Sequence, residues 1–504
     1  MVEMGLNQLL PAELSKHLNS SEKLLLKKAR SRAPAVFANP DKESNPPIRA
    51  EFLYWLCTDS DATKYIHSKG MWVDGATIKG VLDFEGATLP HPLWLVNCVI
   101  PEEIVLRDAT TRSIKFSGSR TGQISAQRLR ASGFVELKGV RATGKIVLSG
   151  ADIAGYLNCE GAIINIEDRR QAMRAHRINV SGDVVIKDME VQGSVSFSGA
   201  NINGNLDCDR AVINSANGEV ALNADRLSVG NFFLRRFQVY GTVRLVGARI
   251  SGDLNCDHAS FLGDDEYSLY ARNLTVDGTI FCRHLSKKPS GVVQLLHARI
   301  GQLADDIESW PEAGKLVLDG FVYGSFGLHS PQSAAERLRW IGLQRRDHFS
   351  PHPYEQLAKV FRSTGREAEA RTVLIAKQEA RRKRADLNQR TKAWLWFLGK
   401  SIRYGYEPWR LIGFMIGMIL VGWGVFSFAD MKYTADFAPQ FNSFIYSLEV
   451  FLPVVDLHQE RYYLPSGSSQ YGAWIRTYFW LHIVLGWVST TLLVAALTGL
   501  IRRD

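Results

Sequence analysis

Two carboxylates stand in a part of the sequence that is otherwise apolar. Residues 444–455 are apolar apart from Ser447 and Glu449, and Asp456 follows directly. Ionisable groups at membrane depth usually face a cavity or a pore, so this pair predicts a pathway for ions. Because twelve residues are too few to cross a bilayer and too apolar for an open loop, we expect a re-entrant segment. An interfacial helix on the outer face is the alternative.

The same stretch predicts how such a pore would be built. We expect residues 443–455 to enter the membrane from the outer side as a short helix that stops at Pro453, since proline cannot continue a helix. The carbonyls of residues 451–452 would then line the ion path. Glu449 would lie behind this filter, hydrogen-bonded towards Asp456, and Gly486 would let the second span bend as a gate. The predicted pore residues are Glu449, Phe451, Leu452, Pro453, Val454, Val455, Asp456 and Gly486.

A second set of residues mixes aromatic rings with cations, away from any apolar stretch. Bases stack on aromatic rings while phosphates pair with Lys and Arg, so this mixture predicts binding of a single-stranded oligonucleotide. A solvated surface is the alternative. The residues are Arg337, Arg339, Trp340, Arg345, Arg346, Tyr354, Lys359, Arg362 and Arg366.

A third set recurs along the middle of the chain, at Cys159, Cys208, Cys256 and Cys282. Acidic or amide residues flank the first three, as in Asp207 and Asp209. Paired carboxylates on a solenoid face would suit acid–base cleavage of polysaccharides, and a ladder of thiols would suit metal or redox chemistry. No cluster of these carboxylates has a basic side chain beside it in the pattern. Buried Cys commonly acts as a small hydrophobic residue. Six cysteines without CxxC pairs predict no zinc or disulfide framework, so we expect packing, a solvated face, no cofactor and no enzyme activity.

The pore residues require a membrane hairpin to position them. Residues 411–429 carry no charge, and residues 477–501 contain only His482 as an ionisable side chain. Both are long enough to span a bilayer. The flanks before the first span and after the second are rich in Lys and Arg, whereas the loop between them carries more acids than cations. Residues 409–504 are therefore predicted to form a transmembrane pore domain with both chain termini in the cytoplasm.

The cysteines belong to a repeat that predicts a β-solenoid over residues 73–325. Each unit has a glycine followed by alternating apolar positions, which is the period-2 pattern of a strand after a turn. Neighbouring glycines differ by 11 residues (155 − 144) or by 26–27, where loop insertions are expected at one corner. Strand–turn units of about 11 residues that stack in register make a solenoid. The motif starts at Gly133, Gly144, Gly155, Gly182, Gly193, Gly204, Gly230, Gly241, Gly252 and Gly278.

Helical patterns occupy the remaining segments. Residues 1–72 predict amphipathic helices joined by a Pro-containing linker, and residues 326–408 predict a basic helical neck. Its two helices joined at Gly365 resemble a single tetratricopeptide-type hairpin. Residues 1–25 contain no apolar run, so we expect no secretory signal and a cytosolic body before the hairpin. The net charge of +9 favours anionic partners such as phospholipid headgroups or nucleic acid.

The segment from Ser447 to Asp456, Ser-Leu-Glu-Val-Phe-Leu-Pro-Val-Val-Asp, resembles the pore helix and filter of two-span potassium channels. The resemblance covers about a dozen residues and the layout of span, half-span, span. It departs from that family in the filter, where the glycines are missing and Pro453 stands. The resemblance therefore implies a pore, with four subunits by analogy, and not potassium selectivity.

A wider resemblance rests on the solenoid, on Pro353-Tyr-Glu-Gln-Leu357, on Tyr404-Gly-Tyr-Glu-Pro-Trp409 and on the hairpin. These features are similar to bacterial membrane proteins found in antiphage defence, including the membrane effector of Hailong-type systems. That resemblance implies an inner-membrane channel controlled by nucleic-acid oligomers from a partner nucleotidyltransferase. We thus expect a gated ion channel. The alternatives are a membrane-anchored solenoid scaffold, which could polymerise end to end as bactofilin-like filaments do, and a solenoid enzyme.

Overall fold

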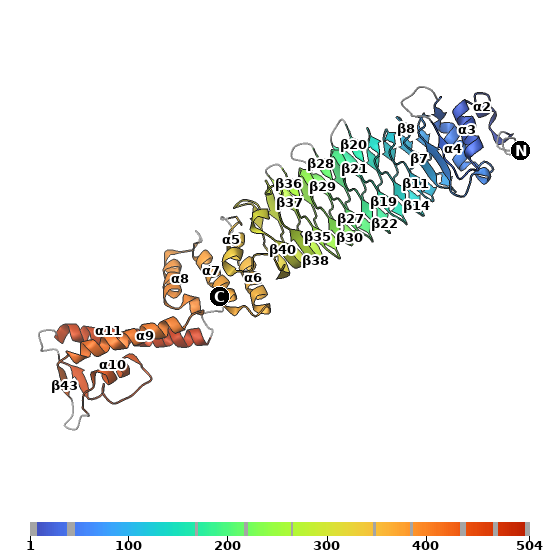
Figure 1. The fold of residues 1–504 in the computed structure, drawn as a ribbon. Coiled ribbons are helices and arrows are strands. Elements are labelled where there is room, and N and C mark those ends of the chain that lie inside the picture. Colours follow the sequence, from blue (N-terminus) through green and yellow to red (C-terminus); the bar gives the residue numbers. More distant parts are fainter. Residues whose placement is uncertain are drawn as a thin grey trace. The chain divides into compact units, whose positions relative to one another are not determined.

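The computed structural model describes residues 8–37, 46–166, 170–215, 220–263, 266–345, 349–383, 387–433, 440–466 and 472–498. The chain divides into two compact units, Met1–Thr364 and Gly365–Asp504. The first contains the solenoid with helices at its ends, and the second is helical (Figure 1). The division places the helices of residues 334–363 with the solenoid, whereas the sequence grouped them with the neck.

The predicted β-solenoid is confirmed, and its strands stack in parallel (Figure 1). A typical coil has four short strands, for example β10 (Thr110–Thr111), β11 (Ile114–Lys115), β12 (Arg120–Thr121) and β13 (Ile124–Ser125). Ile114 pairs with Val135, and Val135 pairs with Leu157. A coil therefore takes 21 (135 − 114) or 22 (157 − 135) residues. The 11-residue unit of the sequence is half a coil.

The glycines of the repeat occupy two opposite corners of the coil. At the corner between the first and second strands, a Cβ on Gly230 would lie 2.7 Å from the carbonyl oxygen of Gly204 in the preceding coil. At the corner between the third and fourth strands, a Cβ on Gly144 would lie 2.7 Å from the backbone nitrogen of Gln123. Successive coils thus approach too closely for a side chain at both corners, which explains the glycine at these turns.

Insertions leave the solenoid at one corner, as the sequence predicts. In each case the strand before the insertion belongs to an 8-stranded sheet and the strand after it belongs to an 11-stranded sheet. These pairs are β20 (Ile163–Asn165) and β21 (Gln171–Arg174), β28 (Val212–Asn214) and β29 (Val220–Asn223), and β36 (Ser260–Leu262) and β37 (Tyr267–Tyr270). Each of these three insertions lies at the corner between the third and fourth strands of its coil.

Helices cover both ends of the solenoid (Figure 1). At the N-terminal end lie α2 (Ala12–Ser15), α3 (Ser20–Lys28) and α4 (Ala50–Thr58), and β1 (Ala35–Val36) pairs with β3 (Met71–Asp74). The buried Glu22 carboxylate accepts from the Arg49 guanidinium at 2.8 Å and fixes α3 there. At the other end the long strands β38 (Thr275–Cys282), β40 (Arg299–Asp305) and β42 (Val322–Phe326) precede α5 (Ala334–Ile341) and α6 (His352–Ser363).

The second unit holds two long apolar helices with a short helix packed against both (Figure 1). Among the described residues, α9 (Trp409–Ser427) and α11 (Gly472–Leu497) are long and apolar enough to cross a membrane. They coincide with most of the two predicted spans. The remaining elements are α7 (Glu367–Arg382), α8 (Gln389–Ser401), η3 (Arg403–Gly405), β43 (Met431–Tyr433), α10 (Ser443–Phe451) and β44 (Tyr463–Pro465), with β43 and β44 paired antiparallel.

Candidate functional site

The short helix α10 begins and ends where its sequence predicts. The Asn442 side-chain oxygen accepts hydrogen bonds from the backbone N–H of Phe444 and Ile445, which caps the first turn. The helix ends at Phe451, and Leu452 is extended (φ −98°, ψ 104°) because the following Pro453 disfavours helical geometry before it. The sequence therefore sets the length of this helix.

A chain of polar side chains joins α10 to both long helices. The Ser447 hydroxyl donates to the Ile419 carbonyl of α9 at 2.7 Å. His482 of α11 lies 3.3 Å from the same hydroxyl, and its other ring nitrogen lies 3.2 Å from the Tyr478 hydroxyl. Gly422 of α9 makes room for this group, since a Cβ there would overlap Ser447 and His482. The hydrogen-bonding capacity of the buried Ser447 is thus used to hold three helices together.

Gly486 has a different role from the predicted one. The carbonyl oxygen of Phe451 lies where a Cβ on Gly486 would be, so the end of α10 rests directly on the backbone of α11. The prediction that the Phe451 carbonyl faces the ion path is wrong, because this oxygen is turned towards α11 of the same chain. Nothing in this contact indicates a bend at Gly486. It is a position of close helix approach.

Glu449 holds the chain that follows α10. Its carboxylate is buried and accepts hydrogen bonds from the backbone N–H of Gln459 at 2.8 Å and of Glu460 at 3.2 Å. The Gln459 side chain in turn accepts from the Asn442 N–H at 3.1 Å. The predicted hydrogen bond from Glu449 towards Asp456 is not formed, since Glu449 is satisfied by backbone donors further along the chain. These bonds close the loop of residues 452–460 against the start and the side of α10.

The loop itself projects outward from these anchors. The Val454 side chain is 86% exposed, whereas Leu452, Pro453 and Val455 are partly buried. The Leu452 carbonyl accepts from the Val455 N–H at 3.1 Å and closes a tight turn. Asp456 is exposed and lies 2.7 Å from His458. The hydrogen bonds from His458 lower the pKa of the Asp456 carboxyl below its usual range, which keeps it charged.

Two members of the predicted oligonucleotide surface lie in the core of the first unit. The Arg337 guanidinium makes a bidentate ion pair with Asp305 at 2.8 and 2.9 Å, and both side chains are 1% exposed. Trp340 is buried beside Trp310, whose indole N–H also donates to Asp305 at 2.8 Å. The assignment of Arg337 and Trp340 to a ligand surface is wrong, because they anchor α5 to the last coils of the solenoid.

The other predicted members have different surroundings. Arg339, Arg345, Lys359 and Arg362 are exposed, and Tyr354 is half-buried. Arg366 lies in the second unit and pairs with Glu369 at 3.3 Å. Arg346 lies outside the described residues. The structure therefore leaves a sparser basic surface on α5, α6 and the segment between them.

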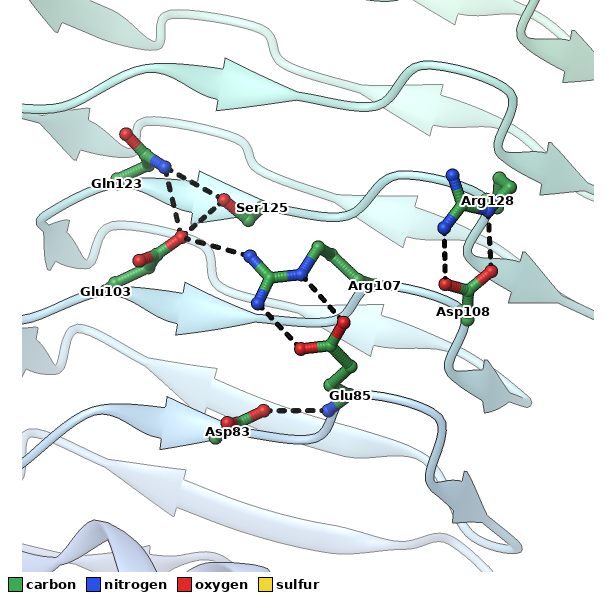
Figure 2. A network of polar contacts seen from close by, with 8 residues as sticks. All are labelled: Asp83, Glu85, Glu103, Arg107, Asp108, Gln123, Ser125 and Arg128. Carbon is green, nitrogen blue, oxygen red and sulfur yellow. Dashed lines mark hydrogen bonds and ion pairs between the residues drawn. The ribbon is translucent and has the colours of Figure 1, made fainter.

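Several carboxylates of the solenoid face are held in ion pairs with neighbouring coils. Asp257 accepts from Arg283 at 2.6 Å, Glu160 lies 3.0 Å from Lys138, and Asp209 accepts from Arg235. Figure 2 shows the same arrangement in earlier coils, where Arg107 bridges Glu85 and Glu103 and where Arg128 pairs with Asp108. These carboxylates link one coil to the next, whereas Asp207 accepts from the backbone N–H of Asp209 in its own coil.

The cysteines line the interior of the solenoid. Cys159, Cys208 and Cys256 are buried, and Cys282 is packed beside Cys256 on the next coil. Burial raises the pKa of the Cys159 and Cys256 thiols to about 12. Among the described residues, no group of three or more His, Cys, Asp and Glu side chains could hold a metal ion.

Comparisons of this chain with protein-family models, with curated proteins and with solved structures find no match.

Proposed function

We propose that this chain is a subunit of a gated membrane ion channel. The observation that carries the proposal is the position of α10, a short helix packed against two span-length helices and followed by an outward loop. The Ser447 hydrogen bond to Ile419 and the close approach of the Phe451 carbonyl to Gly486 hold it against the long helices, and Glu449 fixes the loop that follows. A merely interfacial helix would not need a buried carboxylate to fix the loop after it, since such a carboxylate is costly unless it is hydrogen-bonded.

The pore would be lined by the loop and not by the Phe451 carbonyl. Residues 452–456 follow the end of α10, Val454 and Asp456 among them are exposed, and the segment ends at the charged Asp456. Carbonyls and carboxylates at this position would attract cations. Both long helices present apolar side chains outward, including Ile416, Trp423 and Trp487. These faces suit lipid and neighbouring subunits, four in number by analogy with pore-loop channels.

Conductance of the purified full chain in a planar bilayer tests the proposal. We expect cation-selective currents that Asp456→Asn reduces and Lys432→Gln leaves unchanged, because Lys432 lies on β43 outside the loop. Absence of current under voltage and under candidate ligands, in protein shown to be inserted, would contradict it. In intact cells, a reporter fused after the last residue should be active in the cytoplasm, since the positive flanks predict that side.

The scaffold alternative is disfavoured by the ends of the solenoid. End-to-end polymerisation needs a free strand edge at each end. Helices α3 and α4 and strand β1 lie at one end, and at the other the Gln356 amide of α6 donates to the Tyr323 carbonyl of the last coil at 2.7 Å. Electron microscopy of the full chain should show no filaments built through these ends.

We further propose that an oligonucleotide made by a partner nucleotidyltransferase gates the channel, as the likeness to antiphage effectors suggests. The supporting feature is the exposed basic set Arg339, Arg345, Lys359 and Arg362 in the solenoid unit. Phosphates would pair with these cations. Binding of short oligonucleotides to the full chain, with increasing current in the bilayer assay, is the test.

A further inference from the structure

Helix α8 presents large aromatic side chains to solvent. Trp394 and Trp396 are each 54% exposed and Phe397 is 39% exposed. The Trp394 and Phe397 rings stack with centroids 5.8 Å apart. Exposed tryptophans of this size are uncommon on a water-facing helix, and they mark a surface that meets another phase or another molecule.

The exposed aromatics and the cations of α8 share one side of the helix. Arg390, Trp394 and Phe397 are four and three residues apart, which places them on one face. Trp396 and Lys400 follow beside them with the same spacing of four. The opposite side is packed within the unit: Leu398 is buried, and a Cβ on Gly399 would lie 2.8 Å from the Tyr404 hydroxyl. One face of α8 therefore carries aromatic rings and positive charges towards solvent, and the opposite face packs within the unit.

The outward face carries only one sign of charge. Residues 387–401 contain Arg390, Lys392 and Lys400 and no Asp or Glu. Within the described part of the chain, none of these three cations forms an ion pair. A second copy of this face would repel the first by like charge, so a two-fold contact between copies is unfavourable. The complementary partner is an anionic surface that also accepts aromatic rings.

We propose that α8 lies in the plane of the membrane interface and binds anionic phospholipid headgroups of the cytoplasmic leaflet. This rests on the proposed function, because it takes α9 as a span. Tryptophan rings favour the headgroup level, and Lys and Arg next to them pair with lipid phosphates. Only residues 402–408 separate α8 from α9, so the helix cannot lie far from the start of the span.

The turn between α8 and α9 connects the proposed lipid-binding helix rigidly to the first span. Ile402, Tyr404 and Tyr406 are buried in it, and η3 packs against α8 and α11. Arg403 and Tyr404 have positive φ angles of 46° and 57°, which side chains rarely adopt and which only surrounding packing maintains. A lipid contact at α8 would therefore be transmitted to the base of α9 through a fixed joint.

The test uses the full chain reconstituted in vesicles, with a fluorophore on an introduced cysteine and with lipid brominated either near the headgroup or, for the span, along the acyl chain. Phe397→Cys labels the proposed face, Val421→Cys labels the exposed side of α9, and Lys69→Cys labels the solenoid unit; the parent chain gives the background. We expect bromolipid to remove at least about half of the fluorescence at 397. We also expect stronger quenching when phosphatidylserine is present, and no quenching at 69.

The outcomes separate this inference from the channel proposal. Quenching at 421 without quenching at 397 would overturn the placement of α8 while leaving the membrane span intact, and quenching at neither site would contradict both. Self-quenching between labels at 397 would assign this face to contacts between copies and would also overturn the inference. Removing the three cations together (Arg390→Gln, Lys392→Gln and Lys400→Gln) should abolish the phosphatidylserine dependence at 397 without changing the signal at 421.

Discussion

The Phe451 carbonyl oxygen occupies the place where a side chain on Gly486 would begin. This single contact joins the end of the short helix α10 to the middle of the long helix α11. It means that residue 486 must lack a Cβ for α10 to reach its position.

Gly486→Ala should therefore displace α10. We expect a loss of stability of about 1–3 kcal/mol, typical of overpacking a well-packed contact, and a loss of conductance in the bilayer assay. Gly417→Ala on α9 is the matched control, because nothing lies within 4 Å of a Cβ there and alanine favours helix. Equal effects of the two substitutions on the melting temperature in detergent would show that Gly486 matters only as a flexible residue.

Glu449→Ala should release the loop after α10. The substitution leaves the buried N–H of Gln459 without an acceptor, at about 1–3 kcal/mol, and also removes the acceptor of the part-buried Glu460 N–H. Glu449→Gln retains one acceptor oxygen and should be milder. Proteolysis within residues 452–460 measures the release, and we expect faster cleavage in the order Ala, Gln, wild type. Identical cleavage of all three proteins would mean that Glu449 does not hold the loop.

Gly230→Ala should destabilise the solenoid by more than glycine replacement normally does. Its Cβ would lie 2.7 Å from a backbone oxygen, so the coils must move apart. Gly161→Ala is the comparison, because it has open space and only the strain of a positive φ, worth about 1 kcal/mol. Thermal unfolding followed by circular dichroism should show a larger decrease for Gly230→Ala, and the reverse order would contradict the close-approach argument.

Oligonucleotide binding should depend on Arg345, Lys359 and Arg362. Changing all three to Glu should abolish affinity, while in the wild type each phosphate contact should add about one unit to the slope of log affinity against log salt. Charge reversal at the exposed Lys23, Lys27 and Lys69 gives the same change in net charge elsewhere in this unit. If both triple variants bind equally, the basic surface around α6 is not the site.

The stability of the solenoid should fall in acid through Glu136. Burial acts to raise the pKa of this carboxyl, but hydrogen bonds from Lys115 at 2.9 Å and Ser117 at 2.7 Å outweigh burial and lower it. Its stabilisation is therefore present above the ordinary carboxyl pKa of 4.5 and is lost as the pH falls through the lower pKa of the folded state. Lys115→Met should shift this loss to higher pH in melting curves measured between neutral and acid pH. An unchanged pH profile would exclude Glu136 as the cause.

Local patterns were sufficient to predict the solenoid, its insertion corner, the two span-length helices and the extent of α10. Glycine spacing, period-2 alternation and long apolar runs each act within a few residues, so the sequence contains them directly. The end of α10 follows from Pro453, because proline restricts the residue before it whatever the surroundings.

Only the tertiary structure decided the partners of the charged and aromatic residues. Arg337 and Trp340 have the composition of a binding surface, yet Asp305 lies 32 residues away in sequence and draws Arg337 into the core. Glu449 finds donors 10 and 11 residues further on, and Gly486 is defined by a carbonyl on another helix. Likewise, two 11-residue units form one coil only because each strand pairs with the strand two units away in the sequence. Each of these outcomes depends on contacts between distant parts of the chain, which no local spacing encodes.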